Sequence, residues 1–303
     1  MRIEKILLFI RLTRPIFLLG VALIYALGVG IAHYLGASID WRIYILGQVW
    51  VTLLQLSTQY LNEFYNTPGD QENKNRTYLT GGSGALGKDK LPRRVALLAA
   101  LSCLAFLASS TVLIISIGSF SPLIYIIMIL AFIGSFFYSS PPLKLEASGY
   151  GELIATIIVA LMVPSFAFIL QSGELNRLVA MTIFPLAALH MSMLLAFELP
   201  DYASDLKFEK FTLMVRIGWQ NGMKLHNTLI LSAFLLIIVA LYFGMPRKVA
   251  LSGLITIPLG IFQIWQMRRI AMGGRPNWNS LTIIALALFA LTTYFMTFTY
   301  WIN

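Results

Sequence analysis

Acidic and amide side chains concentrate in two short stretches of the 303-residue chain, each directly after an apolar run. Seven of the thirteen acidic residues lie there: Glu63, Asp70 and Glu72 in the first stretch, and Glu198, Asp201, Asp205 and Glu209 in the second. The first stretch also holds Asn62 and Asn66. Mg²⁺ is typically held by one or two carboxylates together with water and the phosphate oxygens of a substrate. The two stretches therefore predict a magnesium site for a phosphate-bearing substrate.

The spacing within each stretch gives its side chains a common direction. Residues four apart share a helix face, so Asn62 and Asn66 are predicted to point the same way, as are Asp201 and Asp205. Pro68-Gly69 predicts the end of the first helix, and Pro200 predicts a kink or break before the second acidic pair. The predicted metal ligands are Asn62, Glu63, Asn66, Asp70, Asp201 and Asp205. The alternative is that these are ordinary solvated residues at helix ends.

Basic residues near the two stretches suit a phosphate partner. Lysine and arginine neutralise phosphate oxygens, and the candidates are Lys74, Arg76, Lys210 and Arg216. The turn Gly81-Gly82-Ser83-Gly84 offers backbone N–H groups to the same ligand. A loop that begins at Tyr138 and contains Pro141-Pro142 adds one more base, Lys144. For each base, the alternative is a residue that only marks the side of the membrane on which its loop lies.

The elements that must position these residues are membrane helices. Hydrophobic residues make up 58% of the chain and charged residues only 12%, against about 25% charged residues in a soluble domain. Long uninterrupted apolar runs predict spanning helices and argue against a barrel, whose strands alternate. The chain is predicted to be all-α and polytopic, with nine spans near residues 16–36, 43–61, 94–117, 122–138, 151–171, 178–199, 226–244, 249–267 and 281–301.

The distribution of positive charge predicts the orientation. The net charge is +9, but the bases lie in short loops between apolar runs, which favours membrane lipid over nucleic acid as the partner. Eighteen of the 22 Lys and Arg residues fall in the N-terminal segment and the longer connections. The positive-inside rule then places the N-terminus and the acidic loops in the cytoplasm, in a multi-pass protein of the inner (cytoplasmic) membrane.

At these positions the chain resembles the UbiA-type intramembrane prenyltransferases over most of its length, as one domain covering residues 1–303. The resemblance lies in nine helices, an Asn-Asp-x-x-Asp-x-x-x-Asp-like motif after the second, and an Asp-x-x-x-Asp motif after the sixth. A Tyr-Ser-x-Pro-Pro-Leu-Lys loop follows the fourth helix, and Thr13-Arg14-Pro15 precedes the first. The order and placement of these motifs together make the resemblance specific.

The resemblance implies the reaction. Mg²⁺ would hold a polyprenyl diphosphate between the acidic motifs, and ionisation would give an allylic cation in a mainly apolar chamber enclosed by the helices. An aromatic acceptor would then capture this cation. The implied catalytic residues are Asp70, Asp201, Asp205 and Lys144, and the implied substrate-binding residues are Asn62, Asn66, Lys74, Arg76, Tyr138, Lys210 and Arg216. The stretch Thr212–Gly218 resembles the menaquinone-pathway branch, whose acceptor is 1,4-dihydroxy-2-naphthoate.

Two departures from the family pattern concern the first motif. Glu63 and Asn66 stand where the family has aspartates, so the motif has lost one carboxylate. Glu63 is expected either to compensate as a ligand or to pair with Lys74 or Arg76. Two other functions stay open: a transporter, and a prenyl-lipid-binding protein with a weakened catalytic site.

Overall fold

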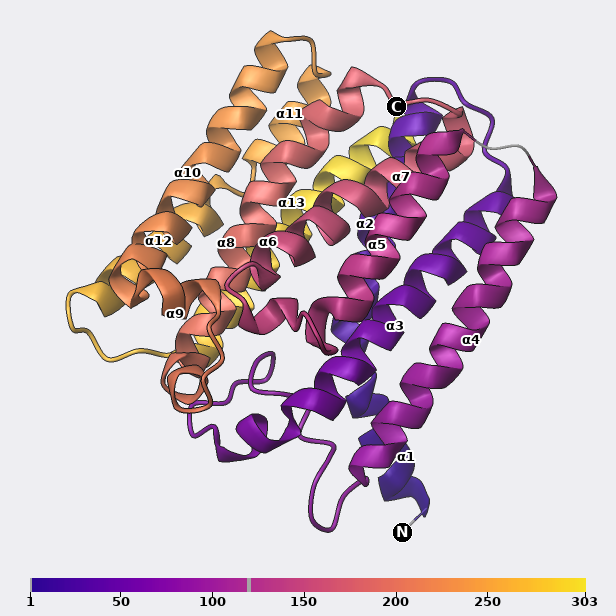
Figure 1. Ribbon diagram of the computed structural model, residues 1–303. Coiled ribbons are helices and arrows are strands. Elements are labelled where there is room, and N and C mark those ends of the chain that lie inside the picture. Colours follow the sequence, from indigo (N-terminus) through magenta and orange to yellow (C-terminus); the bar gives the residue numbers. More distant parts are fainter. Residues whose placement is uncertain (1, 119–120) are drawn as a thin grey trace.

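A computed structural model describes residues 2–118 and 121–303, with the side chains of Arg2 and of residues 68–72 outside the description. The regular elements of the described chain are helices, apart from one isolated bridge between Leu86 and Leu91, which confirms the predicted all-α class (Figure 1). Its helices are α1 Arg2–Leu12, α2 Pro15–Tyr34, α3 Trp41–Glu72, α4 Arg93–Ile117, α5 Pro122–Ser139, η1 Leu145–Ala147, α6 Gly151–Thr156, η2 Ile157–Met162, α7 Val163–Ser172, α8 Arg177–Lys207, α9 Leu213–Ile217, α10 Trp219–Tyr242, α11 Arg247–Leu254, α12 Ile257–Ala271 and α13 Trp278–Ile302.

Each predicted span corresponds to one long helix or one stack of shorter helices. Within the described residues, eight of these segments are long and apolar enough to cross a membrane. The remaining one, α3, is 32 residues long but is interrupted by Gln48, Gln55 and Gln59. It packs along α4 and also contacts α2, α5 and α7. Its polar residues therefore belong to the interior of the bundle, where lipid does not determine composition.

Local sequence explains where several helices begin. Asp40 caps α3, because its carboxylate accepts hydrogen bonds from the backbone N–H groups of Arg42 at 2.8 Å and Ile43 at 3.3 Å. Asn176 and Asn277 cap α8 and α13 through single bonds to backbone N–H groups. Proline occupies the first turn of α2 and α5, where its missing N–H has no intrahelical partner to lose.

Two prolines lie inside helices, although the sequence predicted a helix end at Pro68-Gly69 and a kink or break at Pro200. The helix α3 continues through Pro68-Gly69 to Glu72, and α8 continues through Pro200 to Lys207. Proline removes one backbone hydrogen bond, a loss that neighbouring helices can compensate inside a bundle. Asp201 and Asp205 therefore lie on one unbroken helix, one turn apart.

The fifth predicted span contains an irregular turn. Its helix passes from α6 into the π-helical segment η2 and then into α7, where Pro164 lies in the first turn. A π-helical turn widens the helix and often marks a functional position. Here η2 contacts α8.

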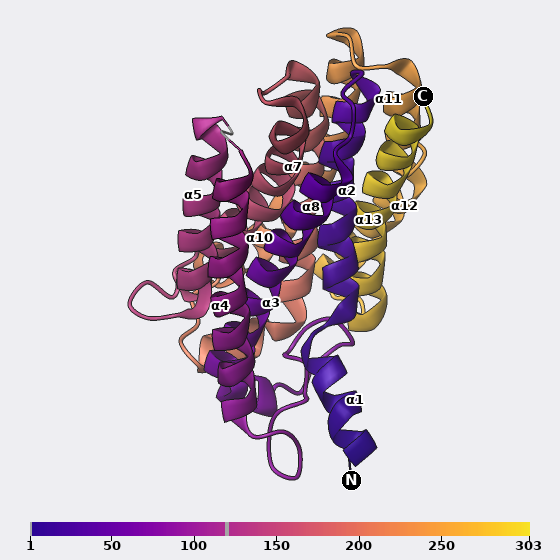
Figure 2. The same ribbon diagram turned by 90° about the vertical axis from the view of Figure 1, so that its right-hand side faces the viewer.

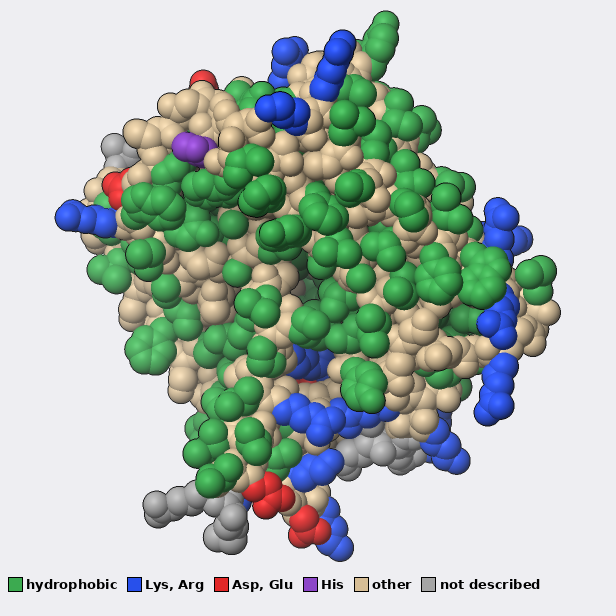
Figure 3. Space-filling model, turned by 180° about the vertical axis from the view of Figure 1, so that it is seen from behind, with side chains coloured by type: hydrophobic (Ala, Val, Ile, Leu, Met, Phe, Trp, Pro, Cys, Tyr) green, Lys and Arg blue, Asp and Glu red, His purple; other side chains and the backbone are tan. Residues whose placement is uncertain are grey.

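The longer connections gather at one end of the bundle. Figure 1 shows α1, α9 and the loop between α3 and α4 in the lower half of the molecule, and Figures 1 and 2 both show the chain's C-terminus at the upper end. Figure 3 shows a face with hydrophobic side chains across its middle, Lys and Arg side chains in its lower part and along its right-hand edge, and a smaller group of them at the top. This distribution is typical of a multi-pass integral membrane protein.

Candidate active site

A cavity of about 280 Å³ lies inside the bundle and combines a polar part with an apolar part. The apolar part includes Phe17, Ile158, Val159, Met193, Leu194 and Phe197. The polar part is rich in acids and amides and also contains two bases. Its charged and amide residues are Arg14, Gln55, Gln59, Asn62, Asn66, Glu146, Glu152, Glu198, Asp201, Asp205 and Lys210.

One wall of the cavity is a polar stripe on α3. Gln55, Thr58, Gln59, Asn62 and Asn66 line the cavity from positions i, i+3, i+4, i+7 and i+11, which form a single helix face. This stripe explains why α3 is more polar than the other long helices. Every side chain in the stripe is uncharged.

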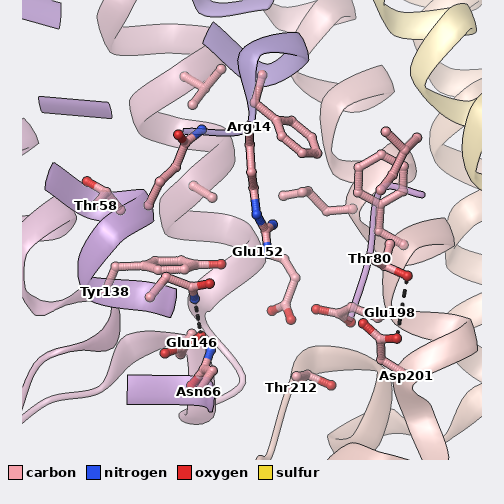
Figure 4. A pocket seen from close by; sticks show the side chains of 18 of the residues that line it. Arg14, Thr58, Asn66, Thr80, Tyr138, Glu146, Glu152, Glu198, Asp201 and Thr212 are labelled. Carbon is pink, nitrogen blue, oxygen red and sulfur yellow. Dashed lines mark hydrogen bonds between the residues drawn. The ribbon is translucent and has the colours of Figure 1, made fainter. Parts of the chain in front are cut away.

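The amide pair on α3 is held by a carboxylate from another element. The side-chain nitrogens of Asn62 and Asn66 each donate to Oε2 of Glu146 at 2.7 Å. Asn62 also donates to Ser139 Oγ at 3.2 Å. The Nζ of Lys210 lies 3.4 Å from the same Glu146 oxygen. Glu146 thus joins α3 to the segment that follows α8, and Figure 4 shows it beside Asn66.

Backbone geometry around η1 brings Glu146 to this position. Lys144, which precedes η1, has a left-handed conformation with φ 43°. At Gly151, the first residue of α6, an added Cβ would lie 2.6 Å from the Cα of Glu146. Only glycine permits so close an approach of the two backbones. Glu146 is consequently buried, with 5% of its surface exposed.

The opposite wall is the acidic face of α8. Glu198, Asp201 and Asp205 line the cavity from positions three and four residues apart. Asp201 is held in place, because its Oδ1 accepts from Asn73 Nδ2 at 2.6 Å and from Thr80 Oγ1 at 3.4 Å. Its Oδ2 accepts from the Gly81 N–H at 3.1 Å.

The glycine-rich turn Gly81-Gly82-Ser83-Gly84 therefore donates backbone hydrogen bonds to carboxylates of the protein. Gly81 and Gly82 have φ of 76°, a conformation that favours glycine, and both line the cavity. The N–H of Gly81, which the sequence offered to phosphate, donates to Asp201, and the N–H of Ser83 donates to Glu63 at 2.6 Å. The turn thereby fixes two acids from two different helices.

Glu152 lies between the two walls in Figure 4, below the descending Arg14 side chain. Its Oε1 accepts from the backbone N–H of Leu213 at 3.2 Å. Its Oε2 is buried and has no hydrogen-bond partner, although only 3% of the residue is exposed. A buried acceptor without a partner costs free energy, about 1–3 kcal/mol. This oxygen fits a cation or a hydrogen-bond donor supplied by a ligand.

The structure brings six of the predicted site residues to one cavity: Asn62, Asn66, Tyr138, Asp201, Asp205 and Lys210.

Four predicted bases do not line it. Lys144 is exposed, and Arg216 donates to the Ser148 carbonyl at 2.9 Å and lies over the Tyr150 ring. Lys74 and Arg76 border a separate polar groove with Arg269 and Arg275. Asp70 has its side chain outside the described residues, so its predicted role stays a prediction.

Glu63 is also absent from the cavity lining, although the sequence made it a candidate ligand. Its Oε1 accepts from Arg14 Nε at 3.0 Å and Nη2 at 2.5 Å, and its Oε2 accepts from Ser83 Oγ at 2.6 Å. The partner is neither Lys74 nor Arg76. The geometry gives Glu63 a structural role: it positions Arg14, which does line the cavity.

Several cavity residues escaped the sequence analysis: Gln55, Thr58, Gln59, Glu146 and Glu152. Glu198 was part of the second acidic stretch, and Arg14 and Thr212 were parts of the family resemblance, but none of these three was named as a site residue. One usable signal existed for α3, since Gln55 and Gln59 extend the face of Asn62 and Asn66 back into an apolar run, at spacings of three or four residues. Glu146 and Glu152 carry no comparable signal. Their position depends on how the segment after α5 folds back.

The acids of the cavity suit a divalent ion whose remaining ligands are water and the phosphate oxygens of a substrate. Among the described residues, no three Asp, Glu, His or Cys side chains converge into a ready-made metal cage. Mg²⁺ does not need one, because it binds through one or two carboxylates while water and phosphate oxygens complete its octahedron. Asp201 and Asp205 on one wall, and Glu146 with its two amides on the other, could hold such an ion, as the unpaired Glu152 oxygen also suggests.

Comparison with known proteins gives a family and a fold. The model of the UbiA prenyltransferase family matches residues 21–276. No curated protein is similar enough in sequence to count as a relative. A solved structure of a UbiA homologue from Archaeoglobus fulgidus, bound to DMAPP and Mg²⁺, is 17% identical with a TM-score of 0.66, over 95% of this chain and 98% of that one.

Two further solved structures share the fold. A digeranylgeranylglyceryl phosphate synthase is 14% identical with a TM-score of 0.64, over 98% of this chain and 97% of that one. An apo UbiA homologue from Aeropyrum pernix K1 is 14% identical with a TM-score of 0.61, over 90% and 94%. With the family model matched across most of its length, the chain belongs to the UbiA prenyltransferase family and is a multi-pass integral membrane enzyme.

Proposed function

We propose that this enzyme transfers a polyprenyl group from a Mg²⁺-bound prenyl diphosphate to an aromatic acceptor within the membrane. The observation that carries the proposal is the two-part cavity, in which facing acidic and amide walls adjoin an apolar region. A prenyl diphosphate has the same two parts, a polyanionic head and a hydrocarbon tail. The solved A. fulgidus homologue with DMAPP and Mg²⁺, and a second structure with GPP and Mg²⁺, support this assignment.

The head would bind between α3 and α8. Asp201 and Asp205 would hold metal on one side, and Asn62 and Asn66 would offer amide oxygens on the other, with Asp70 a further candidate. When bound, Mg²⁺ would neutralise the diphosphate and stabilise the negative charge of the leaving group. Lys210 and the side chain of Arg14, both of which line the cavity, would add positive charge near the same oxygens.

The tail and the reacting carbon would lie in the apolar part. The C1–O bond breaks, its electron pair leaves with the diphosphate, and the allylic cation is captured by a nucleophilic ring carbon that then loses its proton. Phe17, Tyr138 and Phe197 line the cavity, and aromatic faces stabilise cations. The apolar lining also keeps water from capturing the cation.

For the acceptor, we propose 1,4-dihydroxy-2-naphthoate. Support comes from the Thr212–Gly218 stretch and from the position of Thr212 in the cavity wall. Thr212 caps α9, accepting from the Val215 N–H at 3.4 Å, so the stretch is held beside the site. Four of the predicted bases lie outside this cavity: Lys144, Lys74, Arg76 and Arg216. They could contact a substrate only as it approaches the cavity.

An acceptor panel tests the proposal. The purified protein would be incubated with Mg²⁺, labelled geranyl or longer prenyl diphosphates, and either dihydroxynaphthoate or 4-hydroxybenzoate. Prenylated naphthoate is the expected product. Prenylation of 4-hydroxybenzoate alone would contradict the acceptor assignment. Donor binding without any turnover would favour a lipid-binding protein, and passage of an anion across vesicles without prenylation would favour a transporter.

A further inference from the structure

The α3 wall lacks a carboxylate of its own among the described side chains that line the cavity. Its stripe from Gln55 to Asn66 is neutral, and Glu63 is held by Arg14 and Ser83 instead. A metal ion that bridges this wall to a diphosphate needs negative charge, because the affinity of such ions depends on the charge of their ligands. Asp70 also lies on α3, but its side chain is outside the description; among the described cavity residues, the carboxylate that reaches the two amides comes from another element.

We propose that Glu146 supplies this charge and acts, with the amide oxygens of Asn62 and Asn66, as a ligand of the divalent metal on the α3 side. The inference rests on the proposed function above. Glu146 is the acid that contacts both amides, each at 2.7 Å. It enters from η1, a different part of the chain from either acidic stretch.

The arrangement of the amides favours a cation. Each amide uses its nitrogen on Glu146 Oε2, which leaves its carbonyl oxygen for another partner. Neither carbonyl oxygen accepts a hydrogen bond from a described residue. Two amide oxygens and one carboxylate therefore form a group of oxygen ligands that a hard divalent ion prefers.

Glu152 gives independent support. Its Oε2 is buried without a partner, and the residue lines the same cavity. Figure 4 places it between Glu146 on one side and Glu198 and Asp201 on the other. An unpaired carboxylate oxygen in this position indicates that a cationic or donor ligand completes the cavity.

Lys210 would change partner when metal binds. Its ammonium lies 3.4 Å from Glu146 Oε2, the oxygen that also accepts from both amides. A divalent ion at Glu146 competes for this oxygen and displaces the ammonium. Lys210 would then lie beside the diphosphate, where its positive charge would stabilise the negative charge of the leaving group.

The test measures metal binding directly. Mn²⁺ would be titrated into the full-length protein in detergent with geranyl S-thiolodiphosphate, an analogue with a sluggish leaving group, and bound Mn²⁺ would be followed by electron paramagnetic resonance. Glu146→Gln should raise the Mn²⁺ concentration at half-saturation about 10-fold or more. The double variant Glu146→Gln/Asn66→Asp, which moves the charge to α3, should return it to within a few-fold of the wild type.

Glu174→Gln is the matched control, since it removes the same charge from an exposed residue in the connection between α7 and α8. Asn66→Asp alone should lower the half-saturating concentration, and this variant keeps the proposal testable if Glu146→Gln does not fold. An unshifted Glu146→Gln titration, a shift that the double variant does not reverse, or an unchanged Asn66→Asp would each overturn the proposal.

The same experiment separates this inference from the proposed function. A wild-type protein that binds no Mn²⁺ with the analogue would contradict the proposed function itself. A wild-type protein that binds it, with Glu146→Gln unshifted, would contradict only the role of Glu146.

Discussion

Arg14 and Glu63 form an ion pair that joins the start of α2 to the cavity wall: Nε and Nη2 of Arg14 lie 3.0 and 2.5 Å from Oε1 of Glu63. The pair is mostly buried, with 21% and 4% of the two side chains exposed. Arg14 has a left-handed backbone, with φ 45°. The pair therefore fixes an unusual turn and directs a base into the cavity.

Glu63→Gln should reduce stability and leave the metal requirement unchanged. Loss of the charge leaves the partly buried Arg14 without its ionic partner, a change that costs on the order of 1–3 kcal/mol. The melting temperature in detergent should fall by several degrees, while the Mg²⁺ concentration for half-maximal transfer stays within about twofold of the wild type. A large increase in that concentration would restore Glu63 to the set of metal ligands.

Asp201→Ala and Asp205→Ala should each lower transfer by about 100-fold or more, since both remove a carboxylate from the proposed metal-binding wall. Asp201 also holds Asn73 and Gly81, so this variant should loosen the turn as well. Gel filtration would verify folding, with Glu174→Ala as a control at an exposed acid. Near-normal turnover in both folded variants would show that the acidic face of α8 is not part of the active site.

Gly151→Ala should disturb the site through the backbone of Glu146. The added Cβ would lie 2.6 Å from the Glu146 Cα, so η1 must shift and Glu146 must leave its amide partners. The Mn²⁺ concentration for half-saturation should rise as it does in Glu146→Gln. Gly20→Ala is the matched control in α2, because its added Cβ meets nothing within 4 Å. The same half-saturating Mn²⁺ concentration in Gly151→Ala and Gly20→Ala would contradict the tight packing of Gly151 against Glu146.

The orientation can be tested with cysteines in a Cys103→Ser background. Gln71→Cys and Phe208→Cys lie in the stretches that we propose to be cytoplasmic, and Leu175→Cys lies in the short connection between α7 and α8. An impermeant maleimide added to intact cells should label position 175 and spare positions 71 and 208 until the cells are opened. Strong labelling of 71 and 208 from outside would reverse the orientation.

The sequence by itself determined the fold class and the common direction of two residue pairs in the proposed site. Apolar runs of spanning length leave a chain in lipid little choice except helices, and the spacing of Asp201 and Asp205 determined that both would face the same way. The i, i+4 spacing of Asn62 and Asn66 did the same for α3. These are local properties, set by helix geometry and composition.

Only the tertiary structure decided which charges meet. Glu63 and Asn62 are adjacent, yet Glu63 pairs with Arg14 while Asn62 faces the cavity and bonds Glu146, 84 residues further along the chain. Pro68, which predicted a helix end, and Pro200, which predicted a kink or break, both lie inside continuous helices; inside a bundle, packing can compensate for one missing hydrogen bond. A carboxylate delivered by a short loop has no periodic pattern to reveal it, and its position depends on the close contact at Gly151 that long-range packing creates.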